Sequence, residues 1–289
     1  MKAAGIVVLS RLQQKRLFVK TRRRSVQKGA RRSGKAGASL EFSDFRSYQP
    51  GDDIRLIDWN IYGRTGKHYI KRFLDEQEIH AAIFLDGTPS MQTIESKWQR
   101  AREIAAALSF IVLNGEDRLT FYPVAANSFG KIARKGTIYA KSVYASVLAL
   151  KSSTISGGFS ELISKESLKS IQAAILISDG LESLSAFEGL FRKFAAARIE
   201  VKFIQVLSQT EIEPQMEGDI QLVDSETGTT VNVTMQETVV KLYQSRLAKH
   251  NEALESLCRK FGFTYVPVSD SHDLQNFLFH KCTAKKVLE

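Results

Sequence analysis

The sequence predicts an α/β protein with a doubly wound, mostly parallel sheet and a small β-rich extension. From about residue 78 onward, apolar strands alternate with helices whose apolar residues recur at helical spacing. The segment 173–177 is apolar throughout, as expected of a strand buried on both faces. Two of the predicted strands are followed by an aspartate, at the sheet edge where doubly wound folds bind ligands.

The alternation defines the elements of a domain over residues 78–289. Strands are predicted over 79–85, 117–124, 173–177, 201–207 and 263–268. Helices are predicted over 97–113, 137–150, 187–197 and 236–261, with a short helix at the end of the chain. A β-hairpin insertion over about 218–234 is expected around the turn formed by residues 225–228.

Two segments precede this domain. Residues 36–77 are expected to form short strands and turns, because Gln49-Pro50-Gly51-Asp52 is a strong turn signal. Residues 1–35 are interpreted as a basic arm, with an amphipathic helix over 1–26, because residues 1–40 hold 12 Lys and Arg and no acid. We expect this arm to add affinity for an acidic surface rather than stability to the fold.

Composition limits the class of protein. The net charge of +10 comes from the arm, since the rest of the chain is close to neutral. The two cysteines form no CxxC pair, which favours a reduced compartment and argues against a zinc site. No apolar run approaches a membrane span, and the apolar stretch 3–9 is too short for a secretion signal. A cytoplasmic location is expected, with peripheral membrane contact left open.

The two strand-end aspartates suggest a metal pocket. Asp86 begins the spacing Asp-x-Thr-x-Ser with Thr88 and Ser90, and Asp179 follows the strand 173–177. Carboxylates and hydroxyls are the oxygen ligands that Mg²⁺ prefers. The alternative is that each aspartate merely caps the helix that follows it.

Residues 86–91 resemble the metal-ion-dependent adhesion site of von Willebrand factor A domains. Upstream, a block resembles the signature of the bacterial domain-of-unknown-function family 58 (DUF58), and the similarity runs from about residue 30 to the C-terminus. The block comprises Arg46, Tyr48, Pro50, Gly51, Asp52, Asp53, Arg55, Asp58 and Trp59. The resemblance implies a von Willebrand factor A-like, Rossmann-like fold with a β-rich extension.

The resemblance also implies a function. It points to a non-enzymatic protein-binding adaptor that acts with a MoxR-type AAA+ ATPase, a client protein, or both, in protein maturation or assembly. Mg²⁺ or another divalent cation is expected to bind weakly, or only together with the partner. The implied metal ligands are Asp86, Thr88, Ser90, Ser160 and Asp179.

This sequence departs from the family pattern at two of these positions. Thr88 stands where Ser is usual, but its hydroxyl offers the same oxygen. Phe159 stands where a Thr ligand is usual, so Ser160 serves only if the loop shifts by one residue. The site is therefore expected to be degenerate.

The signature block has a structural interpretation, which we favour. Its arginines and aspartates are expected to form ion pairs that lock the β-rich extension to the sheet. Pro50 and Gly51 are expected to make a turn, and Trp59 to fill a gap in the core.

Two other functions compete with the adaptor. The first is binding of nucleic acid or another anionic surface through the basic arm, although no reading motif or interleaved aromatic residue supports it. The second is a metal-dependent hydrolase, because Leu85-Asp86-Gly87-Thr88 is similar to a loop of haloacid dehalogenase-like phosphatases. That chemistry needs a nucleophilic carboxylate where this chain has Phe84. No phosphate loop, GxSxG or HExxH motif is present, so no catalytic residue is predicted.

Overall fold

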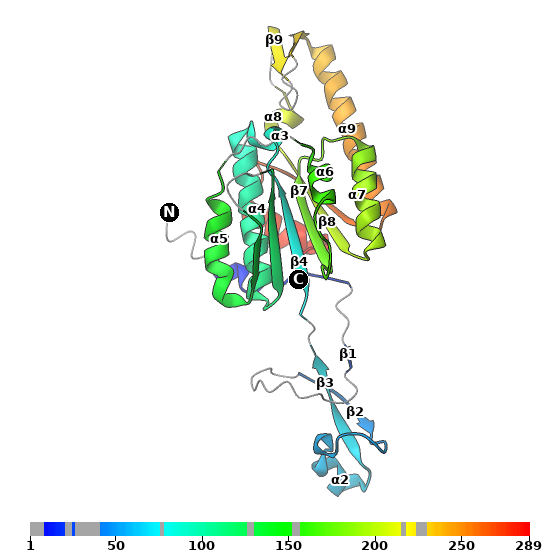
Figure 1. Ribbon diagram of the computed structural model, residues 1–289. Helices are drawn as coiled ribbons and strands as arrows, with labels where there is room; N and C mark the ends of the chain where they lie inside the picture. Colours follow the sequence, from blue (N-terminus) through cyan, green and yellow to red (C-terminus); the bar gives the residue numbers. More distant parts are fainter. Residues whose placement is uncertain are drawn as a thin grey trace. The chain divides into compact units, whose positions relative to one another are not determined.

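The computed structural model describes residues 9–20, 25–26, 41–75, 78–125, 130–151, 157–214, 218–223 and 230–289. The chain divides into two compact units (Figure 1). The main unit consists of Met1–Val19 and Ile79–Glu289, and the small unit of Lys20–Glu78. The two units are described separately below.

The main unit contains a six-stranded sheet in the order β11-β8-β7-β4-β5-β6. Five of its strands are parallel, and only β6 runs antiparallel, against β5. The strands are β4 (His80–Asp86), β5 (Arg118–Val124), β6 (Ile132–Lys135), β7 (Ala173–Ser178), β8 (Glu200–Leu207) and β11 (Thr264–Ser269). The expected mostly parallel α/β architecture is therefore confirmed.

Helices cover both faces of this sheet, as the burial of β4 shows. Ile83 and Leu85 belong to one apolar cluster with α4 (Glu95–Asn114) and α5 (Ala140–Leu148). Ala82 and Phe84 belong to a second cluster with α6 (Phe159–Ser164), α7 (Leu184–Ala196) and the buried face of α9 (Glu237–Lys260). Alternate residues of one strand thus serve two separate cores, which is why the central strands are apolar throughout.

Shorter elements connect and extend this framework (Figure 1). They are α3 (Pro89–Gln92), η2 (Thr137–Tyr139), α8 (Gln209–Ile212), α10 (Leu274–Asn276), η3 (Phe277–Lys281) and α11 (Cys282–Ala284). Strands β9 (Gly218–Val223) and β10 (Thr230–Met235) pair antiparallel, as expected of the hairpin insertion. The turn predicted at 225–228 lies outside the described residues.

The small unit has a three-stranded antiparallel sheet in the order β1-β3-β2. Its strands are β1 (Ser25–Val26), β2 (Glu41–Ser47) and β3 (Tyr69–Asp75). Between β2 and β3 lie η1 (Ile54–Leu56) and α2 (Trp59–Thr65), which the sequence analysis did not predict. Asp58 caps α2 by accepting from the backbone N–H groups of Asn60 and Ile61.

The N-terminal segment corrects one expectation. Residues 9–12 are helical, but Leu17 forms a β-bridge with Leu288 and β1 is a strand, so no helix runs to residue 26. Leu12 and Leu17 are buried in the same apolar cluster as α4. The prediction that residues 1–35 are an arm outside the fold is therefore wrong for residues 9–19, because their leucines supply core contacts. Residues 1–8 and most of residues 21–40 lie outside the described residues.

Truncation of Leu12 tests whether this segment stabilises the fold. Leu12 is fully buried, so Leu12→Ala removes buried methyl groups and leaves a cavity. We expect the free energy of unfolding to fall by about 2–4 kcal/mol in urea denaturation. Gln14→Ala, at an exposed position nearby, is the matched control and should change it by less than about 0.5 kcal/mol. If both substitutions have equally small effects, the N-terminal segment adds little stability, as the arm interpretation holds.

Candidate functional site

The candidate site lies at the point where the strand order of the main sheet reverses. From β4 the chain crosses to β5 on one side, and it later enters β7 on the other side. Ligands of doubly wound sheets bind beyond the carboxyl ends of the strands at such a switch point. Asp86 ends β4 and Asp179 directly follows β7, so both predicted aspartates lie there.

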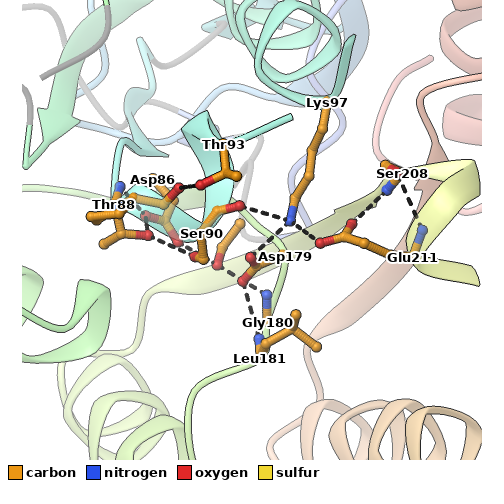
Figure 2. Close-up of polar contacts among 12 residues, drawn as sticks. Asp86, Thr88, Ser90, Thr93, Lys97, Asp179, Gly180, Leu181, Ser208 and Glu211 are labelled. Atoms are coloured by element: carbon orange, nitrogen blue, oxygen red, sulfur yellow. Dashed lines mark hydrogen bonds and ion pairs between the residues drawn. The ribbon is translucent and has the colours of Figure 1, made fainter. Parts of the chain in front are cut away.

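Asp86 organises a short network of hydroxyl groups (Figure 2). Its Oδ1 accepts hydrogen bonds from the backbone N–H of Thr88 at 2.9 Å and from Thr88 Oγ1 at 2.7 Å. Its Oδ2 accepts from Ser178 Oγ at 2.6 Å. Thr88 Oγ1 also lies 3.1 Å from Ser90 Oγ. The predicted group Asp86, Thr88 and Ser90 therefore lies together, and Ser178 joins it.

The loop that carries this group is tightly packed at Gly87. The Gly87 N–H donates to the carbonyl of Val124 at 2.9 Å. A Cβ atom added at Gly87 would lie only 2.8 Å from that carbonyl oxygen, so a larger residue would push the loop away from β5. Pro89 then starts α3 directly after Thr88. Gly87 and Pro89 thus fix the path on which Thr88 and Ser90 are presented.

Asp179 is paired with a buried lysine that the sequence analysis did not identify. Lys97 Nζ donates to Asp179 Oδ2 at 3.0 Å and to Glu211 Oε1 at 2.7 Å. It also donates to the carbonyl oxygen of Ser90 at 3.2 Å. The Lys97 side chain is fully buried. Burial lowers the pKa of its ammonium, but Asp179 and Glu211 outweigh this, so the pKa is raised above its ordinary value.

The sequence does contain a signal for Lys97. It falls at helical spacing with Ala101, Ile104 and Leu108, on the stripe of α4 that faces the core. A lysine on a buried stripe requires acidic partners, because an unpaired ammonium is costly to bury. The sequence contains no comparable signal that Glu211 belongs to the site. It forms a capping box with Ser208 at the start of α8, and this fixes the carboxylate that faces Lys97.

The site carries more negative than positive charge. Asp86, Asp179 and Glu211 contribute three carboxyl groups, and Lys97 is the cation paired with two of them. Burial, and then the neighbouring Asp179, raise the pKa of Asp86 to about 7. An additional cation beside Asp86 would relieve this imbalance.

Ser160, the fifth predicted ligand, is held differently from Thr88 and Ser90. Its backbone N–H donates to a carboxylate oxygen of Glu182 at 3.1 Å, so it is attached to the loop that follows β7. Its Oγ is buried and has no hydrogen-bond partner within the described part of the chain. Phe159 is fully buried in the core and presents no ligand atom. The unpaired Ser160 hydroxyl is the kind of group that a bound ligand satisfies.

The five predicted ligands are of the chemical type that a hard divalent cation prefers, but one of them, Asp179, is already bound by Lys97. Two carboxylates and three hydroxyls supply only oxygen atoms, as Mg²⁺ prefers. Lys97, however, already occupies Oδ2 of Asp179. Within the part of the chain that the structure describes, no group of three or more His, Cys, Asp or Glu side chains is placed to hold a metal. A cation here would therefore depend on hydroxyl oxygens and on Asp86.

The alternative that both aspartates are helix caps is wrong. The cap of α3 is Thr88, and the cap of α7 is Ser183, whose side chain accepts from the backbone N–H of Ala186. Asp86 and Asp179 instead bind backbone N–H groups two residues ahead, within their own loops. These loops place the carboxylates at the sheet edge rather than at a helix end.

The signature block forms ion pairs, and these join residues within the small unit rather than tying it to the main sheet. Arg46 makes a bidentate contact to Asp52, at 2.7 and 2.8 Å, across the turn that contains Gly51, where φ is +100°. Arg55 pairs with Asp53 at 2.7 Å. Asp58, besides capping α2, pairs with Lys71 at 3.1 Å.

Trp59 corrects the expectation that it fills a gap in the core, because it is 61% exposed. Its ring makes edge contacts with the rings of Tyr62 and His68. Tyr62 stacks on His68 with ring centroids 4.4 Å apart. Tyr48 also contacts His68. Trp59 is the first residue of α2, after the Asp58 cap, and no residue of this helix is buried.

The fold and the site define an α/β protein with an oxygen-lined site at the switch point of its sheet. The family described as protein of unknown function DUF58 matches residues 44–253, and the chain belongs to this family. Two mycobacterial proteins are similar: Uncharacterized protein Mb1516 of Mycobacterium bovis and Uncharacterized protein Rv1480 of Mycobacterium tuberculosis. Each is 23% identical over 245 residues, which span 82% of this chain and 77% of the relative.

Two solved structures resemble the chain at low TM-scores. An aerotolerance-related membrane protein from Bacteroides fragilis has a TM-score of 0.37 and 16% identity. BatB from Bacteroides thetaiotaomicron has a TM-score of 0.34 and 14% identity. Each match covers 72% of this chain and 98% of the other. At these scores neither similarity supports an argument about this chain. Among the described helices, none has both the length and the apolar character needed to cross a membrane.

The raised pKa of Asp86 predicts a pH-dependent stability in metal-free protein. The folded state holds this proton up to about pH 7, whereas the unfolded state loses it near the ordinary pKa of 3.8. The free energy of unfolding should therefore fall between pH 4 and 7, by an amount on the order of 4 kcal/mol. Asp86→Asn should remove this part of the decline, as measured by urea denaturation in the presence of chelator.

The control for this pH series is Glu161→Gln, which removes an exposed carboxyl group. Groups that titrate elsewhere affect all variants alike, so the difference between Asp86→Asn and the unaltered protein reports on Asp86. Parallel pH profiles for these two proteins would contradict the assignment of a raised pKa to Asp86.

Proposed function

We propose that this protein is a non-enzymatic adaptor whose main unit is a von Willebrand factor A-like, Rossmann-like domain. A divalent cation bound among Asp86, Thr88, Ser90, Ser160 and Asp179 would bridge to a carboxylate of a partner protein. The partner is a MoxR-type AAA+ ATPase, its client, or both. The observation that carries the proposal is the Asp86 hydroxyl network at the switch point of the sheet.

The charges at the site support a cation that binds weakly until a partner arrives. Lys97 neutralises part of the negative charge and holds Asp179 Oδ2. Mg²⁺ dehydrates reluctantly and demands near-octahedral geometry, so a site with one aspartate engaged elsewhere gives low intrinsic affinity. The cation supplies a Lewis-acidic position that a partner carboxylate can fill. Metal and partner affinities are then coupled.

A protein-binding role is favoured over the hydrolase alternative. Phe84 stands where the phosphatase-like nucleophile would be, and it is fully buried, stacked on Tyr122 with ring centroids 4.5 Å apart. It has no group that could form a covalent intermediate. The nucleic-acid alternative depends on basic residues of which most lie outside the described residues, so it rests on charge alone.

The exposed aromatic group of the small unit supports a second contact surface. Trp59 is 61%, Ile54 62% and Tyr62 39% exposed. Tryptophan and tyrosine are enriched among the residues that dominate protein interfaces. The ion pairs of the signature block hold the turn and the helix that present these residues. The block therefore combines a structural role with an exposed binding face.

Asp86→Ala tests the metal-dependent part of the proposal. We expect it to retain the fold but to weaken binding of the MoxR-type ATPase from the same genome at least tenfold in the presence of Mg²⁺ or Mn²⁺. Isothermal titration calorimetry, with and without a chelator, gives the measurement. Glu161→Ala, which removes an exposed carboxylate paired with Lys165, is the control and should leave binding unchanged. Partner binding that ignores both the chelator and Asp86→Ala would sink the metal-bridged mechanism.

Trp59→Ala tests the second surface. Because Trp59 is mostly exposed, its removal should change the free energy of unfolding by less than about 1 kcal/mol. Loss of an interface tryptophan should nevertheless weaken ATPase binding by tenfold or more. Ile138→Ala is the control, since Ile138 is 83% exposed on the main unit. If both variants bind equally well, Trp59 is not part of the interface.

A further inference from the structure

A cleft separate from the Asp86 network lies at the carboxyl ends of β8 and β11. Its volume is about 420 Å³, within the range of small-molecule sites. Helix α9 and the end of α8 contribute the remaining walls. Its lining consists of Gln205, Leu207, Ile212, Glu213, Gln244, Leu247, Ala248, Asn251, Pro267, Val268, Ser269, His272 and Lys281.

Most of the cleft wall is apolar. Leu207 comes from β8, Leu247 and Ala248 come from α9, and Pro267 and Val268 come from β11. A wall of this kind accepts a hydrocarbon chain, because each buried methylene contributes about 0.8 kcal/mol. The apolar wall does not by itself determine whether the ligand is neutral, cationic or anionic.

Lys281 supplies a positive charge, which favours an anionic ligand. It is half-buried, and its ammonium group has no hydrogen-bond or ion-pair partner among the described residues. It ends η3, a π-helical turn, and such turns occur frequently at functional sites. Lys281 also lines an adjoining recess of about 190 Å³ with His272, Asp273 and Asn276. An ammonium group shared by two recesses is a place for an anionic headgroup.

Two further hydrogen-bond donors line the same cleft. His272 Nδ1 accepts from the backbone N–H of Ser269 at 3.0 Å, so the proton of the neutral ring is on Nε2. Asn251 Oδ1 accepts from Gln205 Nε2 at 2.8 Å, which leaves the Asn251 amide N–H groups as donors. Lys281, His272 and Asn251 thus all offer N–H groups rather than acceptors.

Two carboxylates also line this region, Glu213 in the cleft and Asp273 in the adjoining recess. Glu213 accepts from Gln209 Nε2 at 3.0 Å, and Asp273 accepts from the backbone N–H of Asn276 at 2.7 Å. Neither is within ion-pair distance of Lys281 in the described structure. The cation of the cleft is therefore available to a ligand.

We propose that this cleft binds a small anionic amphiphile, a carboxylic acid with an apolar chain. The carboxylate lies against Lys281 and His272, and the chain lies along the wall formed by Leu247, Pro267 and Val268. A charge-assisted hydrogen bond to a carboxylate is stronger than one between neutral groups, so the headgroup sets the specificity. The proposal goes beyond the adaptor function and does not depend on it.

Titration of the full chain with sodium decanoate by isothermal calorimetry tests the proposal. We expect saturable binding of one decanoate per chain, at least tenfold tighter than that of 1-decanol or decylamine. Lys281→Met should weaken decanoate binding at least tenfold. Lys285→Met is the control, because it removes an equal charge from an exposed position four residues further on. It should leave the affinity within twofold.

A second variant tests the cleft independently, in case Lys281→Met disturbs the fold. Ala248→Trp places a bulky side chain at an exposed position of α9 that lines the cleft, so it should block decanoate while leaving the thermal midpoint unchanged. Asp86→Ala should leave decanoate binding unchanged, which separates this site from the proposed metal site.

Three results would overturn the proposal. The first is equal affinity for decylamine, 1-decanol and decanoate, which would indicate an unspecific apolar surface. The second is an equal loss of affinity in Lys281→Met and Lys285→Met, which would indicate long-range attraction. The third is the absence of saturable decanoate binding by the unaltered chain below 1 mM, a limit that corresponds to about −4.1 kcal/mol.

Discussion

The buried ammonium of Lys97 is the interaction on which the arrangement of the site depends. From the first turns of α4 it joins Ser90 in α3 to Asp179 after β7 and to Glu211 in α8. Removing one partner of a buried ion pair costs about 3–5 kcal/mol, because the other charge is left uncompensated. These segments are far apart in the sequence, so one side chain fixes the positions of three loops at the edge of the sheet.

The same interaction sets what the site can bind. A cation placed beside Asp86 competes with Lys97 for Asp179, and the hydroxyls of Thr88 and Ser90 are left as the ligands that Lys97 does not use. Hydroxyl ligands bring no charge, so the net attraction for a cation comes mainly from Asp86. In the proposed complex, a partner carboxylate would fill the remaining coordination position of that cation. The proposed site would then be assembled in the free protein and completed in the complex.

The sequence predicted features that depend on local spacing and missed those that depend on distant contacts. Asp86, Thr88 and Ser90 share one loop, so their convergence could be expected from their spacing alone. Glu211 contacts Lys97 across 114 residues of sequence, and Leu17 pairs with Leu288 near the other end of the chain. A core position for Trp59 is expected from its residue type alone, whereas its 61% exposure depends on how the small unit packs around α2.

Gln205 contacts both the Asp86 site, through Asp179, and the cleft proposed to bind an amphiphile. Its Nε2 donates to the carbonyl oxygen of Asp179 and to Asn251 Oδ1, both at 2.8 Å, and its Oε1 accepts from the Tyr265 hydroxyl. The side chain is fully buried and its hydrogen bonds are satisfied on both sides. Coupling between two sites requires an element with two arrangements that each ligand stabilises differently. Gln205 is held by three partners in this structure, so the two proposed sites are expected to bind their ligands independently.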